Sequence, residues 1–170
     1  MDDDILVKNA QTYVAQHQIK LAARLGSGFH GIIFGAEGNP KAGQAGLTAI
    51  KVHQYPDPFQ RELAVYQRLA SINIIEIVGF NVPQLLNHDR TLQIIEMTVV
   101  ERPFVLDFGG AHLDYFPEFP NEAWEDWEND MVEKFGVRWP EARGVLAALE
   151  DLDIHMIDVN PGNIGFADLI

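Results

Sequence analysis

The residues best suited to chemistry lie near the end of the chain, where an aspartate and an asparagine stand five positions apart in a short Pro-Gly loop. The loop reads Asp158-Val159-Asn160-Pro161-Gly162-Asn163, and apolar residues flank it on both sides. A carboxylate held between two buried segments can orient a nucleophile, and an amide oxygen can hold a metal ion. The loop therefore indicates a catalytic site if phosphate-binding residues occur elsewhere in the chain.

A glycine-rich segment near the other end of the chain is the candidate phosphate-binding element. It reads Gly26-Ser27-Gly28-Phe29-His30-Gly31, which is a G-x-G-x-x-G pattern, and an apolar run follows it. Glycines let main-chain N–H groups approach anionic oxygens closely. A following helix would favour a dinucleotide site, whereas a following strand favours a hairpin folded over phosphates. A glycine-rich hairpin without any ligand is the alternative.

A lysine stands inside an apolar stretch, Thr48-Ala49-Ile50-Lys51-Val52. A buried ammonium group is costly unless it reaches an anionic partner, and a phosphate or a carboxylate would serve. Glu62 follows 11 positions later, on a predicted helix. If this helix packs against the sheet, the Glu62 side chain can face Lys51. The alternatives are a lysine at a strand edge and a glutamate on a helix surface, both facing solvent.

The hydrophobic pattern predicts the elements that would position these residues. Strands are predicted at Ile19–Leu25, Gly31–Ala36, Leu47–His53, Pro83–Asn87 and Thr91–Glu96. Helices are predicted at 5–17, 56–70, 121–135 and 139–152, with a loop at 37–46 and irregular chain at 97–120. A strand-rich half followed by a helical half predicts an α+β fold, with an antiparallel five-stranded sheet, a small helical lobe and a cleft between them.

The length, composition and net charge of the chain favour some classes of protein and argue against others. A length of 170 residues with 47% hydrophobic residues suits one globular domain. A net charge of −13 argues against a nucleic-acid partner, because phosphate neutralisation needs clustered basic residues. No apolar run approaches the roughly 18 residues of a membrane span. The absence of cysteine and the acidic start Met1-Asp2-Asp3-Asp4 favour a cytoplasmic protein without a membrane partner.

Taken together in this order, the motifs resemble those of the protein-kinase-like superfamily, including its aminoglycoside-phosphotransferase branch. The glycine-rich segment is similar to the kinase glycine-rich loop, and Ala49-Ile50-Lys51 looks like the family's A-x-K strand. Arg61-Glu62 resembles the helix that supplies an ion-pair glutamate, and Asp158 to Asn163 is similar to the catalytic loop. The resemblance covers most of residues 19–166. It implies a single bilobal kinase-like domain over 1–170, with lobes at about 1–96 and 103–170 and a hinge at about 97–102.

The resemblance implies an ATP-binding phosphotransferase that moves the γ-phosphate to a hydroxyl acceptor, with ATP and Mg²⁺ as cofactors. Asp158 would be the catalytic base, Lys51 would hold the α- and β-phosphates, and Glu62 would position Lys51. Asn163 would bind Mg²⁺. The remaining nucleotide contacts would come from the glycine-rich loop and from Ile33, Ala49, Glu96, Met97 and Thr98.

The chain departs from the family pattern at the second metal ligand. The family carries an Asp-Phe-Gly about a hairpin beyond the catalytic asparagine, whereas Asp168 follows Asn163 by only five residues. Asp168 is the predicted second ligand if one extended stretch replaces the hairpin. An Asp107-Phe108-Gly109 does occur, but it precedes the catalytic loop, so we interpret it as a glycine-rich turn after the hinge. A displaced metal carboxylate from Asp107 or Asp114 is the alternative.

Two other classes of function stay open at this point. A pseudokinase-type binding module without phosphoryl transfer is favoured by the missing second metal ligand. An α+β domain unrelated to kinases would lack a cleft between Lys51 and Asp158. Asn160 stands where protein Ser/Thr kinases typically carry lysine, which favours a small-molecule or atypical acceptor. Acidic residues interleave the aromatic residues of 115–130, and they would suit a basic protein partner if the aromatic stripe is not simply core.

Overall fold

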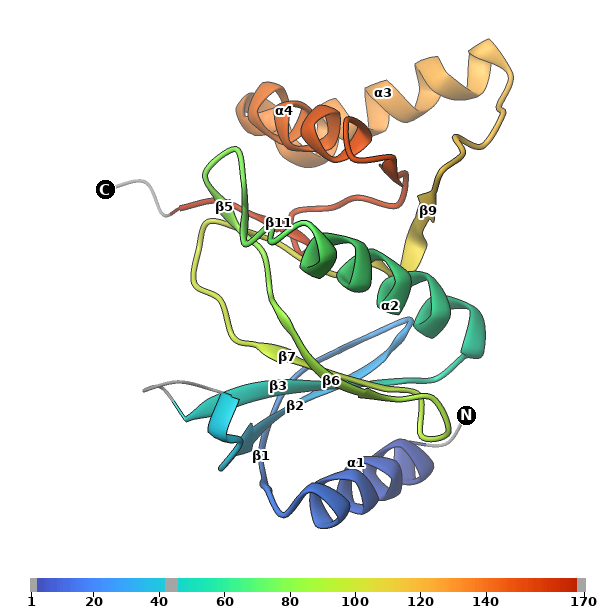
Figure 1. Cartoon of the computed structure of the whole chain (residues 1–170). Helices are drawn as coiled ribbons and strands as arrows, with labels where there is room; N and C mark the ends of the chain where they lie inside the picture. The colour runs from blue at the N-terminus through green and yellow to red at the C-terminus, as the bar shows by residue number, and fades with distance from the viewer. Residues whose placement is uncertain (1–2, 42–45, 168–170) are drawn as a thin grey trace.

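The computed structural model describes residues 3–41 and 46–167, and its centre is an antiparallel sheet with one helix on each face (Figure 1). The sheet has the strand order β1-β2-β3-β7-β6. Its strands are β1 (Lys20–Gly28), β2 (Gly31–Glu37), β3 (Leu47–His53), β6 (Leu85–Asp89) and β7 (Ile94–Thr98). The flanking helices are α1 (Asp3–His17) and α2 (Pro56–Ser71).

The central strand β3 explains why both faces of the sheet carry a helix. Side chains alternate between the two faces of a strand. Ile50 and Val52 are fully buried in the cluster that α1 covers. Ala49 belongs to the cluster that α2 covers, and Lys51 and His53 share its face. A strand buried on both sides reads as a continuous apolar run, so a charged residue inside it needs a partner on its own face.

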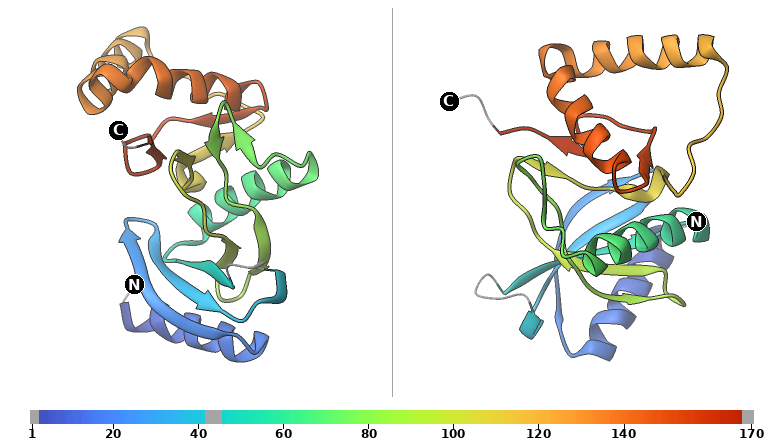
Figure 2. Two further views of the ribbon diagram at one scale, coloured as in Figure 1. Left: turned by 90° about the vertical axis from the view of Figure 1, so that its left-hand side faces the viewer. Right: turned by 45° about the horizontal axis from the view of Figure 1, so that its top comes forward.

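The second half of the chain forms smaller sheets and a pair of helices above α2 (Figures 1 and 2). A four-stranded sheet contains β4 (Glu76–Ile77), β5 (Phe80–Asn81), β8 (Phe104–Val105) and β11 (Ile164–Gly165). A separate antiparallel pair contains β9 (Ala111–Leu113) and β10 (Ile154–Met156). The helical elements are η2 (Phe108–Gly110), α3 (Asn121–Phe135), η3 (Gly136–Arg138) and α4 (Trp139–Glu150).

The predicted α+β fold and its antiparallel five-stranded sheet are confirmed, and every predicted helix is present within two residues of its bounds. The prediction of irregular chain for 97–120 was wrong in part, because β8, η2 and β9 lie there. Strands of two or three residues are too short to show a period of two, so hydrophobic spacing does not reveal them. No described helix combines the length and apolar character that crossing a membrane requires.

Candidate active site

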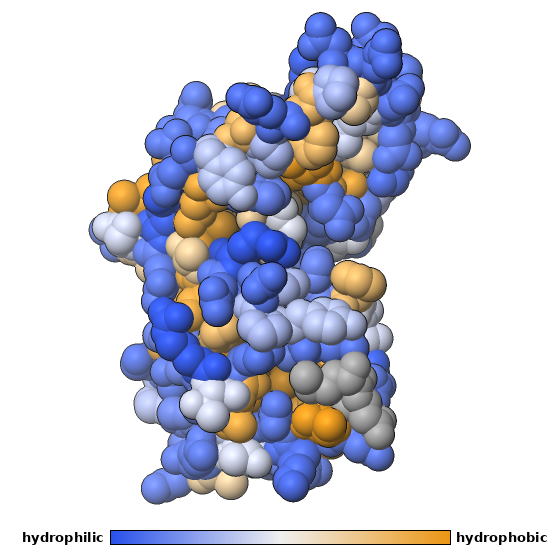
Figure 3. Space-filling view, turned by 90° about the vertical axis from the view of Figure 1, so that its right-hand side faces the viewer, coloured by the Kyte–Doolittle hydropathy of each residue, from blue (hydrophilic) through white to orange (hydrophobic). Residues whose placement is uncertain are grey.

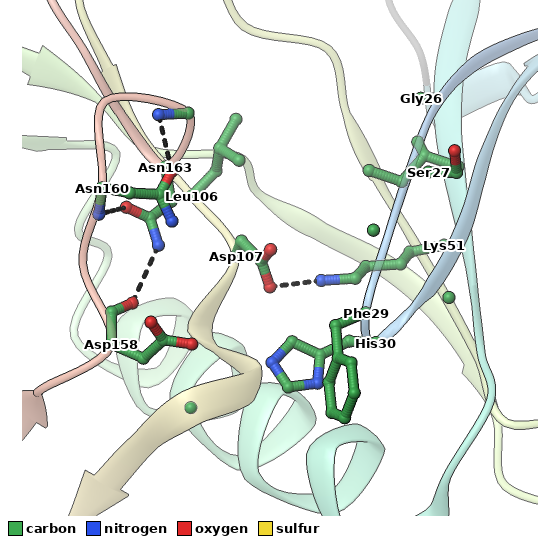
Figure 4. A pocket seen from close by; sticks show the side chains of 15 residues that line it. Gly26, Ser27, Phe29, His30, Lys51, Leu106, Asp107, Asp158, Asn160 and Asn163 are labelled. Atoms are coloured by element: carbon green, nitrogen blue, oxygen red, sulfur yellow. Dashed lines mark hydrogen bonds and ion pairs between the residues drawn. The ribbon is translucent and has the colours of Figure 1, made fainter.

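A cavity of about 350 Å³ lies between the glycine-rich β1–β2 hairpin and the loop that carries Asp158 and Asn163 (Figure 4). It contains every residue of the predicted glycine-rich loop together with Lys51. A second, mostly apolar cavity of about 180 Å³ adjoins it and shares Lys51 and Asp107. The predicted nucleotide residues that line this second cavity are Ile33, Ala49, Met97 and Thr98. A cleft between Lys51 and Asp158 is therefore present.

Glu96 is the described site residue that does not line either cavity. Its fully buried carboxylate faces the other side of the sheet. There it accepts hydrogen bonds from the Tyr13 hydroxyl, the Thr48 hydroxyl and the Asn39 amide, each at 2.8 Å. Burial, with the carboxylate beside it, raises the pKa of the Tyr13 phenol. The Glu96 side chain thus fastens α1 to the sheet, and only its backbone is left for the predicted nucleotide contact.

Lys51 forms the centre of a buried charge cluster. Its Nζ lies 2.6 Å from Glu62 Oε2 and 2.6 Å from Asp107 Oδ1. Burial would lower the pKa of the Lys51 ammonium, but the two carboxylates outweigh it and raise that pKa. Burial would likewise raise the pKa of Glu62, yet Lys51 and His53 together lower it to about 2. The cluster therefore keeps the ammonium and the Glu62 carboxylate ionised without water around them.

His53 extends this cluster, and the sequence reasoning did not identify it. Its Nε2 lies 2.7 Å from Glu62 Oε2, and its Nδ1 lies 3.3 Å from the carbonyl oxygen of Gln93. The side chain is fully buried. Its position two residues after Lys51 could have identified it, because residues i and i+2 of a strand lie on the same face of the sheet.

Asp107 reaches the cavity because its segment is fixed on three sides. Phe108 is fully buried and packs edge-on against Tyr66 of α2, with ring centroids 5.3 Å apart. The Arg61 Nε donates to the carbonyl oxygen of Gly109 at 2.8 Å. The Leu106 N–H donates to the carbonyl oxygen of Asn163 at 2.9 Å. Asp107 itself has φ 63°, a left-handed conformation that is uncommon outside glycine and that aspartate tolerates.

The interpretation of Asp107-Phe108-Gly109 as a turn after the hinge is therefore incomplete, since Asp107 also lines the cavity and binds Lys51. Asp114, the other alternative, lies outside both cavities and forms a 2.7 Å ion pair with Arg68 on the surface. Asp168, the predicted second metal ligand, lies outside the described residues.

Two strand–loop–strand units bring Asp107 opposite Asp158 and Asn163. In the first unit β8 and β9 flank the Asp107 turn, and in the second β10 and β11 flank the loop 157–163. The units pair antiparallel at both ends, because β8 pairs with β11 and β9 pairs with β10. The two loops consequently face each other, and a Cβ built on Gly110 would lie 3.3 Å from Cβ of Asp158.

The loop 157–163 holds its two functional side chains in different environments. Asn163 is only 5% exposed, and its Nδ2 donates to the carbonyl oxygen of Asp158 at 3.1 Å. Its Oδ1 accepts the Asn160 N–H at 2.8 Å and keeps a second lone pair. Asp158 is exposed, while its neighbour Val159 is fully buried and anchors the loop. This alternation explains how a short loop presents a free carboxylate from a fixed backbone.

The glycines of the β1–β2 hairpin divide into two kinds. Gly31 has φ 152°, and a Cβ there would lie 2.0 Å from the carbonyl oxygen of Val52 in β3. Glycine is therefore required at this position by the sheet itself. A Cβ built on Gly26 or Gly28 would meet no described atom within 4 Å. The space around these two positions therefore leaves room for a ligand to approach the backbone closely.

The aromatic stripe of α3 belongs to the packing of the helical part. The Trp127 Nε1 donates to the carbonyl oxygen of Ile157 at 2.9 Å, and the Trp139 Nε1 donates to Glu128 at 2.9 Å. Acidic residues such as Glu122 and Glu125 are exposed on the same helix. One side of the molecule carries mainly hydrophilic residues, with apolar ones scattered between them in both its upper and its lower part (Figure 3). The basic partner stays a prediction.

In comparisons with known proteins, no family model matches the chain, and no curated protein matches it either.

Proposed function

We propose that this protein is a kinase-like phosphotransferase that uses Mg-ATP and a hydroxyl acceptor. The observation that carries the proposal is the Lys51 ammonium held between Glu62 and Asp107, in a cavity that Asp158 and Asn163 also line. Phosphoryl transfer needs a fixed positive charge to bind the phosphates and a base to accept the proton of the acceptor hydroxyl. Lys51, held by two carboxylates on one side of the cavity, and the exposed Asp158 carboxylate on the other side could supply them. Positioning and electrostatic stabilisation supply most of the catalysis in such reactions.

The nucleotide fits the two adjoining cavities by polarity. The smaller cavity is lined by apolar side chains and by the chain from Met97 to Val100, which suits adenine. The larger cavity combines the open backbone at Gly26 and Gly28 with Lys51, which suits a polyphosphate. Volumes of about 350 and 180 Å³ together lie within the usual range for small-molecule sites, about 300–1,000 Å³.

Asp107 and Asn163 are the residues that would hold Mg²⁺. Asp107 uses Oδ1 to bind Lys51, which leaves Oδ2 free, and Asn163 Oδ1 keeps one lone pair. Mg²⁺ commonly takes one or two protein oxygen ligands and completes its shell with phosphates and water. The described residues contain no group of three or more His, Asp or Glu side chains suited to a metal ion, which agrees with such a sparse site. When bound, the ion would neutralise charge on the phosphates.

Asp158 is the residue placed to act on the acceptor. Its exposed carboxylate would take the proton of the acceptor hydroxyl as the hydroxyl oxygen attacks the γ-phosphorus. A new O–P bond forms, and the bond between the γ-phosphorus and the β–γ bridging oxygen breaks. The electron pair of that bond leaves with ADP. Lys51, held by Glu62, would stabilise the phosphate charge during this step.

The proposal keeps the resemblance to kinases but changes the order of the parts. The Asp-Phe-Gly carboxylate comes from the unit before the two helices, and the catalytic loop comes from the unit after them. The pseudokinase alternative rested on the missing second metal carboxylate. Asp107, 2.6 Å from Lys51, is a candidate for that ligand, which supports the phosphotransferase over the binding module.

The proposal is tested by a thermal-shift titration with ATP, with and without Mg²⁺, followed by an ATP-hydrolysis or acceptor-phosphorylation assay. We expect Mg-dependent stabilisation of about 2.7 kcal/mol at a ligand concentration 100 times Kd. Asp107→Asn should abolish the Mg dependence, whereas the matched surface variant Asp114→Asn should keep it.

Other outcomes would point elsewhere. Loss of the Mg dependence in Asp168→Asn but not in Asp107→Asn would move the second ligand to Asp168. Nucleotide binding that is independent of Mg²⁺, without phosphoryl transfer, would support the binding module. A wild-type chain that binds no nucleotide at all would contradict the proposal.

A further inference from the structure

The side chain of His30, at the tip of the glycine-rich hairpin, has no role in the proposed phosphoryl transfer. Its ring lies inside the larger cavity with Lys51, Asp107 and Asp158. The imidazole projects from the hairpin toward the loop that carries Asp158 (Figure 4). It therefore stands between the side of the cavity that holds the lysine and the side that holds the exposed carboxylate.

The ring is held in place by packing, not by hydrogen bonds. A Cβ built on Gly109 would lie 3.1 Å from Cδ2 of His30 and 3.5 Å from its Nε2, so the ring edge packs directly on the Asp107 turn. The backbone is also fixed, because the carbonyl oxygen of His30 accepts the Gln54 N–H at 2.9 Å. The neighbouring Phe29 ring, 80% exposed, packs edge-on against the His30 ring, with centroids 5.6 Å apart, and also contacts Tyr55.

The polar atoms of this ring lack partners among the described residues. Nδ1 is buried without a hydrogen bond, and the part of the chain that the structure describes offers none to Nε2. An imidazole always carries at least one N–H donor, and a donor at the buried Nδ1 would be kept from both water and protein, which favours the N–H at Nε2. A donor fixed inside a cavity that also contains an ammonium group is complementary to an anion with several acceptor oxygens.

We propose that His30 Nε2 donates a hydrogen bond to the terminal phosphoryl group of the bound nucleoside triphosphate. This inference rests on the proposed function and adds a side-chain contact that the backbone of the glycine-rich loop does not provide. The contact acts on the γ-phosphoryl group because the His30 ring projects toward the loop that carries Asp158, where the acceptor must arrive (Figure 4). It gives the site a means to distinguish a triphosphate from a diphosphate, since ADP lacks the group that the ring would bind.

The test compares the affinities for Mg-ATP and Mg-ADP in the full chain, by calorimetry or thermal shift. His30→Gln places an amide N–H near the position of Nε2, His30→Asn places one nearer Nδ1, and His30→Phe keeps the ring without a donor. We expect His30→Phe and His30→Asn to weaken Mg-ATP binding about 10-fold or more, as for loss of one charge-assisted hydrogen bond. Binding of Mg-ADP should change by less than about 2-fold, and His30→Gln should keep most of the ATP affinity.

A histidine far from the cavity serves as the control. His17 is exposed at the end of α1, and His17→Gln should leave both affinities unchanged. The inference is overturned if the His30 variants weaken ATP and ADP equally, or if the Gln, Asn and Phe variants all behave like the wild type. If either of these outcomes is found while the wild-type protein binds both nucleotides, only the role of His30 is overturned, and the proposed function is not. A wild-type chain that binds neither nucleotide would overturn both.

Discussion

The two walls of the cavity differ in the burial and the hydrogen bonding of their polar side chains. On the wall formed by β3 and α2, His53, Glu62 and Lys51 are almost completely buried, and Glu62 contacts both the Lys51 ammonium and the His53 ring. On the wall formed by the loop 157–163 and the hairpin tip, Asp158 is exposed, and Nδ1 of His30 has no hydrogen-bond partner among the described residues. The first wall is preorganised before any ligand arrives, while the second keeps its polar groups free for the reacting atoms.

The difference follows from what each wall would do in the proposed reaction. Groups that hold a polyphosphate gain from fixed positions, because no reorganisation is then needed when charge develops. A group that takes a proton must be able to meet a substrate, so it is left without an internal partner. Mutations on the buried wall should therefore lower stability as well as activity, whereas mutations on the open wall should change binding or rate with little loss of stability.

The largest expected effect on rate comes from Asp158→Asn on the open wall. We expect kcat to fall about 10²- to 10⁴-fold, because the amide cannot accept the acceptor proton. The melting temperature and the affinity for Mg-ATP should stay close to those of the wild type, since the side chain is exposed. A variant that retains wild-type phosphoryl transfer would show that Asp158 is not the base.

The corresponding change on the buried wall is Lys51→Met. It leaves the carboxylates of Glu62 and Asp107 together without their shared cation, so we expect a loss of about 3–5 kcal/mol in the free energy of unfolding. Urea denaturation measures this loss. Lys134→Met removes the surface pair with Asp130 and should cost less than about 1 kcal/mol. Equal losses in the two variants would contradict the buried cluster.

Acid provides a third comparison, because the pKa of Glu62 is lowered from 4.5 to about 2. A group whose folded-state pKa is depressed stabilises the fold above its unfolded pKa and loses that contribution as the pH falls through the folded value. The pKa difference corresponds to a contribution on the order of 3 kcal/mol, lost between about pH 5 and pH 2. Urea midpoints measured across this window should fall more steeply in the wild type than in Glu62→Gln. Parallel slopes would show that Glu62 does not carry the effect.

The smallest expected effects separate the two kinds of glycine in the hairpin. Gly31→Ala should destabilise the protein by about 1–3 kcal/mol, because its Cβ would collide with the β3 backbone. Gly28→Ala should leave the melting temperature unchanged or slightly higher and should weaken Mg-ATP binding. Calorimetry and thermal melts of both variants test this pair. A Gly28→Ala protein with full ATP affinity would argue against backbone contact with the phosphates.

Much of the scaffold follows from hydrophobic spacing along the chain. The short apolar run of β3 and the helical period of α2 predict both elements, and together they predict that Lys51 faces Glu62. The same spacing places His53 on that face, but a histidine at a strand end carries too little signal to distinguish a buried ion-pair partner from a surface residue. The bounds of α3 agree with the prediction because its apolar stripe is regular over the whole helix.

The place of Asp107 does not follow from chain order. A comparison of motifs in sequence expects the second metal carboxylate after the catalytic loop, and this led to Asp168. Antiparallel pairing of two strand–loop–strand units gives the same facing loops whichever unit comes first, provided that the connection between them is long enough. Here α3 and α4 form that connection.

Hydrophobic spacing therefore determines the local elements and the Lys51–Glu62 pair. The opposition of Asp107, Asp158 and His30 depends on strand pairings of two or three residues, which act only when distant segments meet in space.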